Sequence, residues 1–581
     1  MQTALKLAAL VALVGALAPA GAQAAFPGRN GVIAYQTRQS PGGTFDARQA
    51  DGRGFRRIVA AGAVRDPAFS PLGRRLAYVR GGAVWVMQAD GTGQRRLTFQ
   101  GVPEAEPAWS PRGDALAFTA GRPGRRVIEA AGADGQGLRA VTARNGADDR
   151  SPAWSAAGRI AFTRRVRRGT DDLWVLDALG GRPRRLTSTR DDDDWPAWSP
   201  GGGWLAFARG RGSRRDLYLV KADGTRLRRL TRLATTLSSP AFSPDGRTIT
   251  FARGPVGKRQ LWTIRATGKR LKRLTRGRTD AAAPDWQPAP GDPIVDAAGD
   301  IACEPAPRSF PEGVTTTTTC AQYATSDLML RRDLDAVFAL GDLQNDATPR
   351  QDFPRSFVPS WGRLANIMRP VTGNHEYIDP GAAYYFDFFN GPGQFAGPVG
   401  RRDQGFYSFD LGAWHVVALD SECVDPRVDP TGSLCAPGSA QEQWLRADLA
   451  AHPNRCTLAM WHHPYFTSGT NAGRPLLHPI WQALYDYGVE LVLNGHTHGY
   501  ERFEPMDPLG GPDPARGVRE LVVATGGASQ GRFLSPQPGS EVRDNSTFGV
   551  LELRLHRASY SWKFLPVGPG SFTDAGSAAC H

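Results

Sequence analysis

A unit of 40 to 45 residues recurs through the first half of this chain and constrains its fold more than any other feature. Each copy carries a Pro-x-aromatic segment such as Pro107-Ala-Trp109, followed after a turn by an apolar run such as Leu116-Ala-Phe118. The aromatic positions are spaced by 40, 45, 44, 44 and 44 residues and are Phe69, Trp109, Trp154, Trp198, Phe242 and Trp286. Short strands between turns at this period are typical of a β-propeller with one four-stranded blade per repeat. Six aromatic positions therefore predict six blades.

The two ends of the repeated region complement each other. Residues Phe26–Tyr35 match the second part of the unit, and Pro284–Pro288 match its beginning. Joined, they would complete one blade and close the ring, which removes the exposed sheet edges that promote aggregation. A Pro-rich stretch up to Pro293 then ends the repeats. We expect the propeller to occupy residues 25–289.

The repeat is similar to the TolB-type propeller repeats of exported bacterial proteins. This resemblance implies a six-bladed propeller that serves as a binding or scaffold module. It implies no particular activity, because propellers support many functions.

Charge divides the chain at the same place. Residues 1–290 hold 49 Lys and Arg against 23 Asp and Glu, whereas residues 291–581 hold 21 against 33. Arginine pairs such as Arg184-Arg185 could bind an anionic polymer or a cell-surface partner. The alternative is that they keep strands soluble and protect sheet edges. All ten His and all six Cys lie after residue 300, so we expect the chemistry in the second half.

The N-terminus has the order of a secretory signal: Lys6, an apolar run to Leu17, and the small-residue segment Ala22-Gln-Ala24. The run is shorter than the roughly 20 residues that span a bilayer, so no transmembrane segment is expected. We expect residues 1–24 to be removed on export, and the mature protein to be secreted, periplasmic or at the cell surface.

An exported protein enters an oxidising compartment, which favours disulfides. The six Cys also lack the Cys-x-x-Cys spacing of a zinc site. Pairing of nearest neighbours, one of several arrangements, predicts Cys303–Cys320, Cys423–Cys435 and Cys456–Cys580.

Compact apolar runs and helical patterns follow one another in the second half. The runs that predict buried strands are Ile294–Asp296, Ala336–Leu340, Val416–Leu419, Cys456–Met460, Val489–Leu493 and Glu520–Ala524. Ser439 to Glu442 has the form of a helix capping box, and Leu476–Tyr487 has an amphipathic helical pattern. This order predicts an α/β sandwich over residues 290–581.

Five polar motifs lie where strands of this kind end. They are Gly299-Asp300, Gly341-Asp342, Gly373-Asn374-His375-Glu376, Trp461-His462-His463-Pro464 and Gly495-His496-Thr497-His498. Ligand sites in α/β folds lie beyond the carboxyl ends of strands, and Gly permits tight turns there. Asp, Asn and His together suit iron, zinc or manganese, so the motifs predict a metal centre.

In this order the motifs resemble the calcineurin-like metallophosphoesterase superfamily, and most closely its purple-acid-phosphatase branch. The resemblance covers residues 294–560 and implies a four-layer α/β sandwich that binds two metal ions. It implies that Asp300, Asp342 and His498 bind the first metal, and that Asp342 bridges to a second metal completed by Asn374, His462 and His496. His462 matches better than His463 because the family's ligand lies two residues before a Pro, here Pro464. His375 matches the acid that steadies or protonates the leaving oxygen, with Glu376 orienting it.

The resemblance further implies that a hydroxide bridging the two metals, ~3.5–4 Å apart, hydrolyses phosphate monoesters as in acid phosphatases. Loops at Tyr377–Gly405 and Thr467–Arg474 would select the leaving group, so a phosphodiesterase or nucleotidase is the alternative. Arg474 could contact a phosphate or be solvated.

Two positions depart from the family pattern. The purple branch has Tyr three residues after the second Asp, where this chain has Asn345. Other branches have His two residues after the first Asp, where this chain has Ala302. Asn345, Gln344 or water is left to complete the first metal site, and the tyrosinate-to-iron colour is expected to be absent. The departures also leave open a non-catalytic, propeller-based binding protein with a degenerate metal site.

Overall fold

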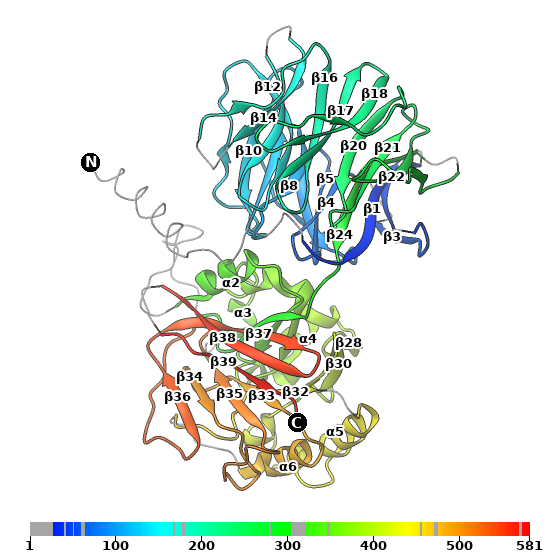
Figure 1. The fold of residues 1–581 in the computed structure, drawn as a ribbon. Coiled ribbons are helices and arrows are strands. Elements are labelled where there is room, and N and C mark those ends of the chain that lie inside the picture. The colour runs from blue at the N-terminus through cyan, green and yellow to red at the C-terminus, as the bar shows by residue number, and fades with distance from the viewer. Residues whose placement is uncertain are drawn as a thin grey trace, which may run out of the picture. The chain divides into compact units, whose positions relative to one another are not determined.

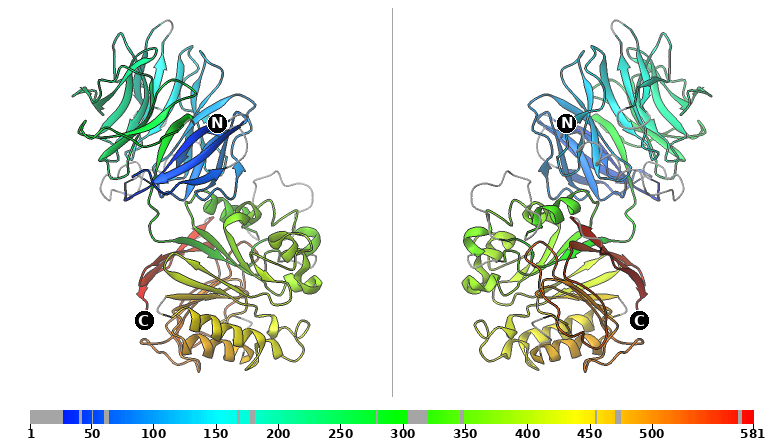
Figure 2. Two further views of the ribbon diagram at one scale, coloured as in Figure 1. Left: turned by 90° about the vertical axis from the view of Figure 1, so that its right-hand side faces the viewer. Right: turned by 90° about the vertical axis from the view of Figure 1, so that its left-hand side faces the viewer.

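The structure, a computed structural model of the 581-residue chain, describes residues 27–39, 42–49, 51–59, 64–166, 169–176, 181–277, 280–303, 320–345, 349–453, 456–469, 475–568 and 572–581. The expected export signal at residues 1–24 and Arg474 lie outside the described residues. The chain divides into two compact units, Met1–Pro290 and Gly291–His581. Figures 1 and 2 show the strands of the first unit in blue to green and the sheets and helices of the second in green to red.

Six four-stranded antiparallel sheets form the first unit, as the repeat predicts. The innermost strands are β4 (Val64–Phe69), β8 (Glu104–Trp109), β12 (Asp148–Trp154), β16 (Asp192–Trp198), β20 (Leu237–Phe242) and β24 (Asp280–Pro288). The second strands are β5 (Arg75–Arg80), β9 (Ala115–Ala120), β13 (Ile160–Arg165), β17 (Trp204–Arg211), β21 (Thr248–Arg253) and β1 (Asn30–Gln39). The third strands are β6 (Ala83–Gln88), β10 (Val127–Gly132), β14 (Asp171–Leu176), β18 (Arg214–Lys221), β22 (Gln260–Arg265) and β2 (Gly42–Gln49). The outer strands are β7 (Arg95–Arg96), β11 (Arg139–Ala140), β15 (Arg184–Arg185), β19 (Arg228–Arg229), β23 (Lys272–Arg273) and β3 (Arg56–Val59).

The sixth blade is built from both ends of the repeated region. Strand β24 pairs with β1, placing Trp286 opposite Ile33 and Asp285 opposite Ala34, and the sheet continues through β2 and β3. The predicted joining of the two ends is therefore confirmed. Each repeated aromatic residue ends an innermost strand or lies near its end, and five of the six are almost fully buried between blades.

The arginine pairs of the outer strands join neighbouring blades. In three pairs the first arginine donates to a carbonyl of the next blade: Arg95 to Ala133 at 2.7 Å, Arg184 to Ala222 at 3.2 Å, and Arg228 to Ala266 at 2.7 Å. Part of the basic excess in this half is therefore structural.

Two mixed sheets form the centre of the second unit. The first has the order β27 (Met368–Val371), β26 (Ala336–Leu340), β25 (Ile294–Ala298), β37 (Phe548–His556), β38 (Ser559–Val567) and β39 (Ala575–Ala579). The second has the order β30 (Tyr407–Leu411), β31 (Trp414–Ala418), β32 (Thr457–Met460), β33 (Leu491–Asn494), β35 (Arg519–Val523), β34 (Tyr500–Phe503) and β36 (Ser540–Asp544). Strands β25 to β27 are parallel, as are β31, β32, β33 and β35. A two-stranded sheet, β28 (Ala396–Gly397) and β29 (Gly400–Arg401), lies apart from both.

Helices complete four layers. The helices are α2 (Gln322–Leu330), α3 (Pro349–Asp352), α4 (Ala383–Asn390), α5 (Ala440–Ala451) and α6 (His478–Asp486). Side chains alternate along the second sheet: Val416 packs with the first sheet, whereas Val417 packs with α5 and α6. Figure 2 shows α5 and α6 side by side along the outer face of the second sheet.

One half of the predicted capping box and all three predicted disulfides are present. The Ser439 hydroxyl accepts the Glu442 N–H at the start of α5, while Glu442 accepts from Gly438 rather than from Ser439. Leu476 lies in a short 3₁₀ turn, Pro475–Leu477, so the predicted second helix begins at His478. The pairs are Cys303–Cys320, Cys423–Cys435 and Cys456–Cys580.

Candidate metal centre

The sheets bring the polar motifs to one place because parallel strands end at the same sheet edge. From the first sheet, Asp300 follows β25, Asp342 follows β26 and Asn374 follows β27, and these strands are neighbours. From the second sheet, His462 follows β32, and His496 and His498 follow the adjacent β33.

The backbone at these strand ends is unusual. Asp300, Asp342, His496 and His498 have φ values of 56°, 49°, 74° and 53°. Residues other than Gly rarely adopt this left-handed conformation, which costs about 1–3 kcal/mol and occurs most often at functional sites. Four of the six predicted ligands are therefore held in a conformation that local sequence disfavours.

Glycines leave the room that the ligand side chains occupy. A Cβ on Gly373 would lie 2.4 Å from Asp342 Oδ1, and one on Gly341 would lie 2.5 Å from His462 Nδ1. A Cβ on Gly495 would lie 2.8 Å from Asp300 Oδ2. These contacts are too short for any side chain, so the three motif glycines are required by the packing of the ligands.

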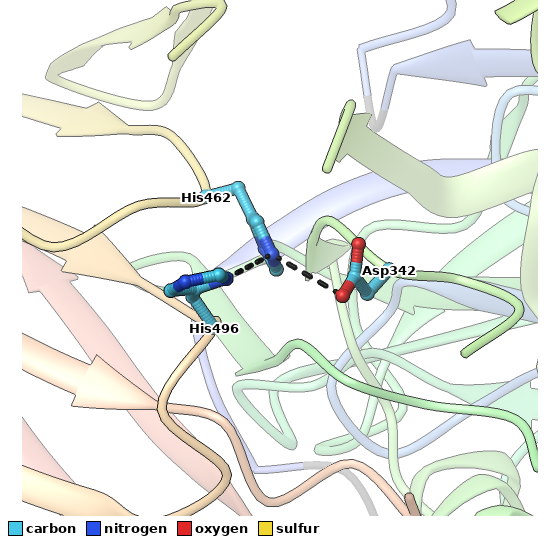
Figure 3. A group of neighbouring side chains, drawn as sticks. All are labelled: Asp342, His462 and His496. Atoms are coloured by element: carbon cyan, nitrogen blue, oxygen red, sulfur yellow. Dashed lines mark hydrogen bonds and ion pairs between the residues drawn. The ribbon is translucent and has the colours of Figure 1, made fainter. Parts of the chain in front are cut away.

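Asp342, His462 and His496 form one compact group, drawn in Figure 3. Their ligand atoms lie within 4.8 Å of one another. His462 Nε2 is 3.4 Å from Asp342 Oδ2 and 3.2 Å from His496 Nδ1. In Figure 3 the His462 ring lies between the other two side chains. Such spacing suits three ligands of a single ion.

Asp300, His498 and Asn345 form a second group beside the first. His498 Nε2 lies 3.2 Å from Asp300 Oδ1. The Asn345 amide nitrogen lies 3.2 Å from His498 Nε2, 3.2 Å from Asp342 Oδ2 and 3.5 Å from Asp300 Oδ1. Asn345 thus reaches the predicted ligands of the first metal, and Asp342 contacts both groups.

Hydrogen bonds fix which nitrogen of each histidine is available. His462 Nδ1 bonds the Leu340 carbonyl at 2.8 Å, and His498 Nδ1 bonds the Ser529 carbonyl at 2.5 Å. Both rings therefore carry the proton on Nδ1 and offer Nε2 as a ligand. Asn374 Oδ1 is buried without a hydrogen-bond partner among the described residues, which a bound cation would supply.

The charges of the site favour a bound cation. Burial lowers the pKa values of His462 and His498, but the carboxylates of Asp342 and Asp300 outweigh it and raise them to about 10 and about 9. Burial raises the pKa of Asp342, yet the charge and hydrogen bond of His462 hold it far below its usual range. Burial, with the neighbouring His463 and His462, lowers the pKa of His496. Oxygen and nitrogen donors in this field fit iron, zinc or manganese.

The two remaining predicted residues lie beside the ligands. The His375 backbone N–H donates to Asp342 Oδ1 at 2.9 Å, and its Nε2 is 3.8 Å from Asp342 Oδ2. Glu376 is fully buried and accepts backbone N–H groups of Asp342, Leu343 and Gly373 at 2.8–3.0 Å. Glu376 therefore ties together the loops that carry Asp342 and Asn374.

The structure adds two neighbours of the ligands: His463, which the sequence analysis set aside in favour of His462, and Glu422, which it did not name. His463 is buried next to His496, with ring centres 4.2 Å apart. Its Nδ1 lies 3.0 Å from the Ser421 hydroxyl and 3.2 Å from Glu422 Oε1. The doubled His462-His463 was a signal for this residue, whereas nothing in the sequence singled out Glu422.

Comparison with known proteins agrees with these observations. Residues 53–236 match the TolB β-propeller domain family, and residues 318–500 match the calcineurin-like phosphoesterase family. Purple acid phosphatase 21 of Arabidopsis thaliana is 30% identical over 265 residues, which cover 41% of this chain and 55% of that protein. Acid phosphatase A of Cryphonectria parasitica is 29% identical over 197 residues, covering 29% of this chain and 38% of that protein. TolB from Acinetobacter baumannii is 24% identical, with a TM-score of 0.40, over 44% of this chain and 67% of that structure.

The chain thus contains a TolB-type propeller domain followed by a calcineurin-like phosphoesterase domain. It spans about half, or less, of the length of the curated relatives it matches. Among the helices of the described residues, none combines the length and apolarity that a membrane span requires.

Proposed function

We propose that this chain is an exported, metal-dependent phosphoesterase that hydrolyses phosphate monoesters, with a signal peptide at residues 1–24, a propeller at 25–289 and a catalytic domain at 290–581. Asp300, Asp342 and His498 would bind one metal ion. Asp342, Asn374, His462 and His496 would bind a second. Iron, zinc and manganese all suit this donor set.

One observation carries the proposal: ligand-type side chains from five strand ends of two sheets meet around Asp342. The carboxylate contacts His462 on one side and Asn345 on the other. A lone Gly-Asp or a lone His after a strand is an ordinary structural feature. Convergence of these residues, with a buried Asn374 oxygen that has no hydrogen-bond partner in the described part of the chain, is what a two-metal site requires.

The chain's own residues divide the work. When bound, two metal ions supply an activated water and stabilise charge on the phosphoryl oxygens. His375, with a quarter of its side chain exposed, lies beside Asp342 where it can donate a proton to the departing oxygen. Glu376 holds the two ligand loops at a fixed separation through three backbone hydrogen bonds. Nδ1 bonds orient His462 and His498.

The first metal site has its own composition in this chain. Asn345 takes the place of the family's Tyr, and its amide lies among Asp300, Asp342 and His498. A half-turn of the side-chain amide exchanges the positions of its O and N and would turn the amide oxygen toward the metal. Ala302 is fully buried and offers no ligand. We propose Asn345 as the additional ligand, with Gln344 or water as the alternatives.

A phosphodiesterase or nucleotidase is the second candidate within the same chemistry. The metal ligands are shared by both activities, so the loops at Tyr377–Gly405 and Thr467–Arg474 would decide the leaving group. Residues 470–474 lie outside the part of the chain that the structure describes.

A propeller-based binding protein is the competing class. The replacement of the expected Tyr by Asn345 favours it, and the basic propeller could then retain an anionic polymer or a cell-surface partner. The ion pair of Arg185 with Asp172 offsets part of the positive charge, and the inter-blade bonds occupy N–H donors of Arg95 and Arg228 that such a partner would need.

The test compares p-nitrophenyl phosphate with bis-p-nitrophenyl phosphate, using the mature protein reconstituted separately with iron, zinc or manganese. Preferred turnover of the monoester supports the proposal, and preferred turnover of the diester supports the second candidate. Turnover of neither, with two metal ions bound per chain, would overturn both and favour the binding protein.

A further inference from the structure

The propeller has a partly open central cavity, and none of the residues of the proposed metal centre lines it. Its volume is about 230 Å³, and residues of all six innermost strands line it. Each blade contributes a segment with Pro at its second position: Asp66–Phe69, Glu106–Trp109, Ser151–Trp154, Trp195–Trp198, Ser239–Phe242 and Ala283–Trp286. Pockets of 300–1,000 Å³ bind drug-sized ligands, so this cavity suits a smaller molecule.

The first residue of every segment adopts the same rare backbone conformation. The φ values are 56° at Asp66, 54° at Glu106, 53° at Ser151, 54° at Trp195, 50° at Ser239 and 46° at Ala283. The residue before Pro normally avoids helical φ/ψ values. The propeller therefore repeats one backbone device six times around the cavity while the side chain on it changes from blade to blade.

The side chains on one side of the ring are acidic. Asp66, Glu106 and Asp285 are the ionisable residues in the lining, although this half of the chain has a large basic excess. They belong to three consecutive blades: Asp285 Oδ2 accepts the Phe69 N–H at 2.7 Å, and Asp66 Oδ2 accepts the Glu106 N–H at 3.3 Å.

Cations compensate these acids incompletely. Asp66 pairs with the partly exposed Arg65 at 3.1 Å. The hydrogen-bond donors to Glu106 are neutral: the Ser151 N–H and hydroxyl at 2.8 Å and the Thr119 hydroxyl at 2.9 Å. Burial raises the pKa of Asp285 to about 7, opposed by backbone hydrogen bonds of Phe69 and Trp286. These carboxylates would therefore stabilise a further positive charge inside the cavity, in addition to that of Arg65.

The opposite side of the ring carries Trp195, between Ser151 and Ser239 of the neighbouring blades. Trp195 lies three blades away from Asp66 in a ring of six, so the two face each other across the cavity. The Arg215 guanidinium lies 5.1 Å from the Trp195 ring centre and covers one face. The rest of the Trp195 indole ring offers apolar surface and a π-system that attracts cations.

We propose that the central cavity of the propeller binds a small organic cation, a primary amine carrying an apolar body, with the ammonium group among Asp66, Glu106 and Asp285 and the apolar body against Trp195. The cavity is too small for a folded partner and its lining has the wrong sign for a phosphate or another anion. A bare metal ion would use the acids and leave Trp195 without a role.

Calorimetric titration of the full-length protein tests this with 2-phenylethylamine, which is a cation at neutral pH, and 2-phenylethanol, its neutral isostere. We expect saturable 1:1 binding of the amine, and binding of the alcohol weaker by about tenfold or more. Equal binding of the two, no binding of the amine at millimolar concentration, or binding of calcium in its place would overturn the proposal.

Variants locate the site. Asp66→Asn combined with Glu106→Gln keeps the hydrogen-bond acceptors and removes two charges, so amine binding should weaken about tenfold or more. Asp223→Asn changes an exposed turn acid in the same propeller and should leave binding unchanged. If the double variant does not fold, Asp285→Asn and Trp195→Leu, each checked by thermal unfolding, take its place. Unchanged amine binding in folded variants of both kinds would also overturn the proposal.

Discussion

The two units place side chains on strained backbone in different ways. Fourteen described residues other than Gly have positive φ; six form the ring around the propeller cavity, and four are predicted metal ligands. In the propeller the backbone position repeats and the side chains differ. In the phosphoesterase domain the four positions do not belong to a repeat, and their side chains are all of ligand type, whereas the fifth positive-φ residue of that domain is Ala382. A repeat thus supplies geometry and leaves the chemistry free, whereas a convergent site specifies both residue by residue.

The largest effect is expected from Asp342→Asn, which should separate the two units cleanly. Asp342 contacts His462 and Asn345 and belongs to both ligand groups, so losing its charge should lower phosphoesterase turnover by about 1,000-fold or more. Bound metal, measured by elemental analysis, should fall with it. Asp486→Asn, at an exposed acid of α6 paired with Arg446, is the matched control. Wild-type turnover in the Asp342 variant would show that the side chains gathered around Asp342 stabilise the fold and do not form a catalytic site.

An all-or-none change in colour is expected at Asn345. Asn345→Tyr restores the family's residue among Asp300, Asp342 and His498, so a ferric ion bound there should gain a tyrosinate charge-transfer band. Visible absorption of the iron-loaded variant measures this. Asn345→Phe, which has similar bulk and no hydroxyl, should stay colourless, as should the wild type. A coloured wild type would show that another tyrosine reaches the metal.

The same contrast explains which parts of the fold could be predicted from the sequence. The propeller was predictable because every blade has the same sequence pattern. Its closure followed from the partial repeat units at the two ends of the region, which pair as β1 and β24. Helix α2 was missed because its buried face includes Gln322, Thr325 and Ser326, so the apolar period that predicts a helix is absent. Tertiary bonds hold that face, including Thr325 to the Gly526 carbonyl at 2.6 Å. Strands β37 to β39, which complete the first sheet, were missed as well.

At the proposed metal centre, the sequence motifs indicate candidate ligands but not the residues that support them. The motifs gave residue types in order, and the family resemblance gave their roles. The contact of His463 with Glu422 joins residues about forty positions apart and depends on how the loop after β31 packs. The positive φ values at Asp300 and His498 are likewise set by tertiary packing, which no local pattern encodes.

Removing a core tryptophan should destabilise one unit and spare the other. Trp109 is 1% exposed, and its indole donates to the Ala68 carbonyl of the preceding blade at 2.9 Å. Trp109→Ala should cost about 3–5 kcal/mol of propeller stability. Trp481→Ala, in the buried face of α6, should cost the phosphoesterase domain a similar amount. Calorimetry measures the two unfolding transitions, and phosphatase assays are made at a temperature below both. The units fold independently only if Trp109→Ala leaves phosphatase turnover intact.

A smaller effect, with a defined pH dependence, is expected at Asp285. Burial raises its pKa from 3.8 to about 7, so the folded propeller holds this proton more tightly than the unfolded chain. The contribution to stability should therefore be present at pH 4, fall as pH rises through 7, and then level off. Asp285→Asn should remove this slope and be more stable at pH 8 by about 2–4 kcal/mol. Urea unfolding across this pH range tests it, with Asp223→Asn as the exposed control.

The smallest effect concerns the arginine pairs, where structure and binding make different demands. Arg228 donates to the Ala266 carbonyl of the next blade through an exposed bond at 2.7 Å. Its loss in Arg228→Gln should therefore cost about 0.5–1 kcal/mol of propeller stability, while Arg232→Gln, at an exposed arginine of the same blade region, should cost less. Retention on polyphosphate at low salt separates the two roles. If the arginines serve an anionic polymer, both variants should lose retention alike, because each removes one charge. If Arg228 chiefly joins blades, the Arg228 variant should be less stable than the Arg232 variant, and its retention on polyphosphate should match that of the wild type. That result would indicate that the basic excess of this half serves the contacts between blades.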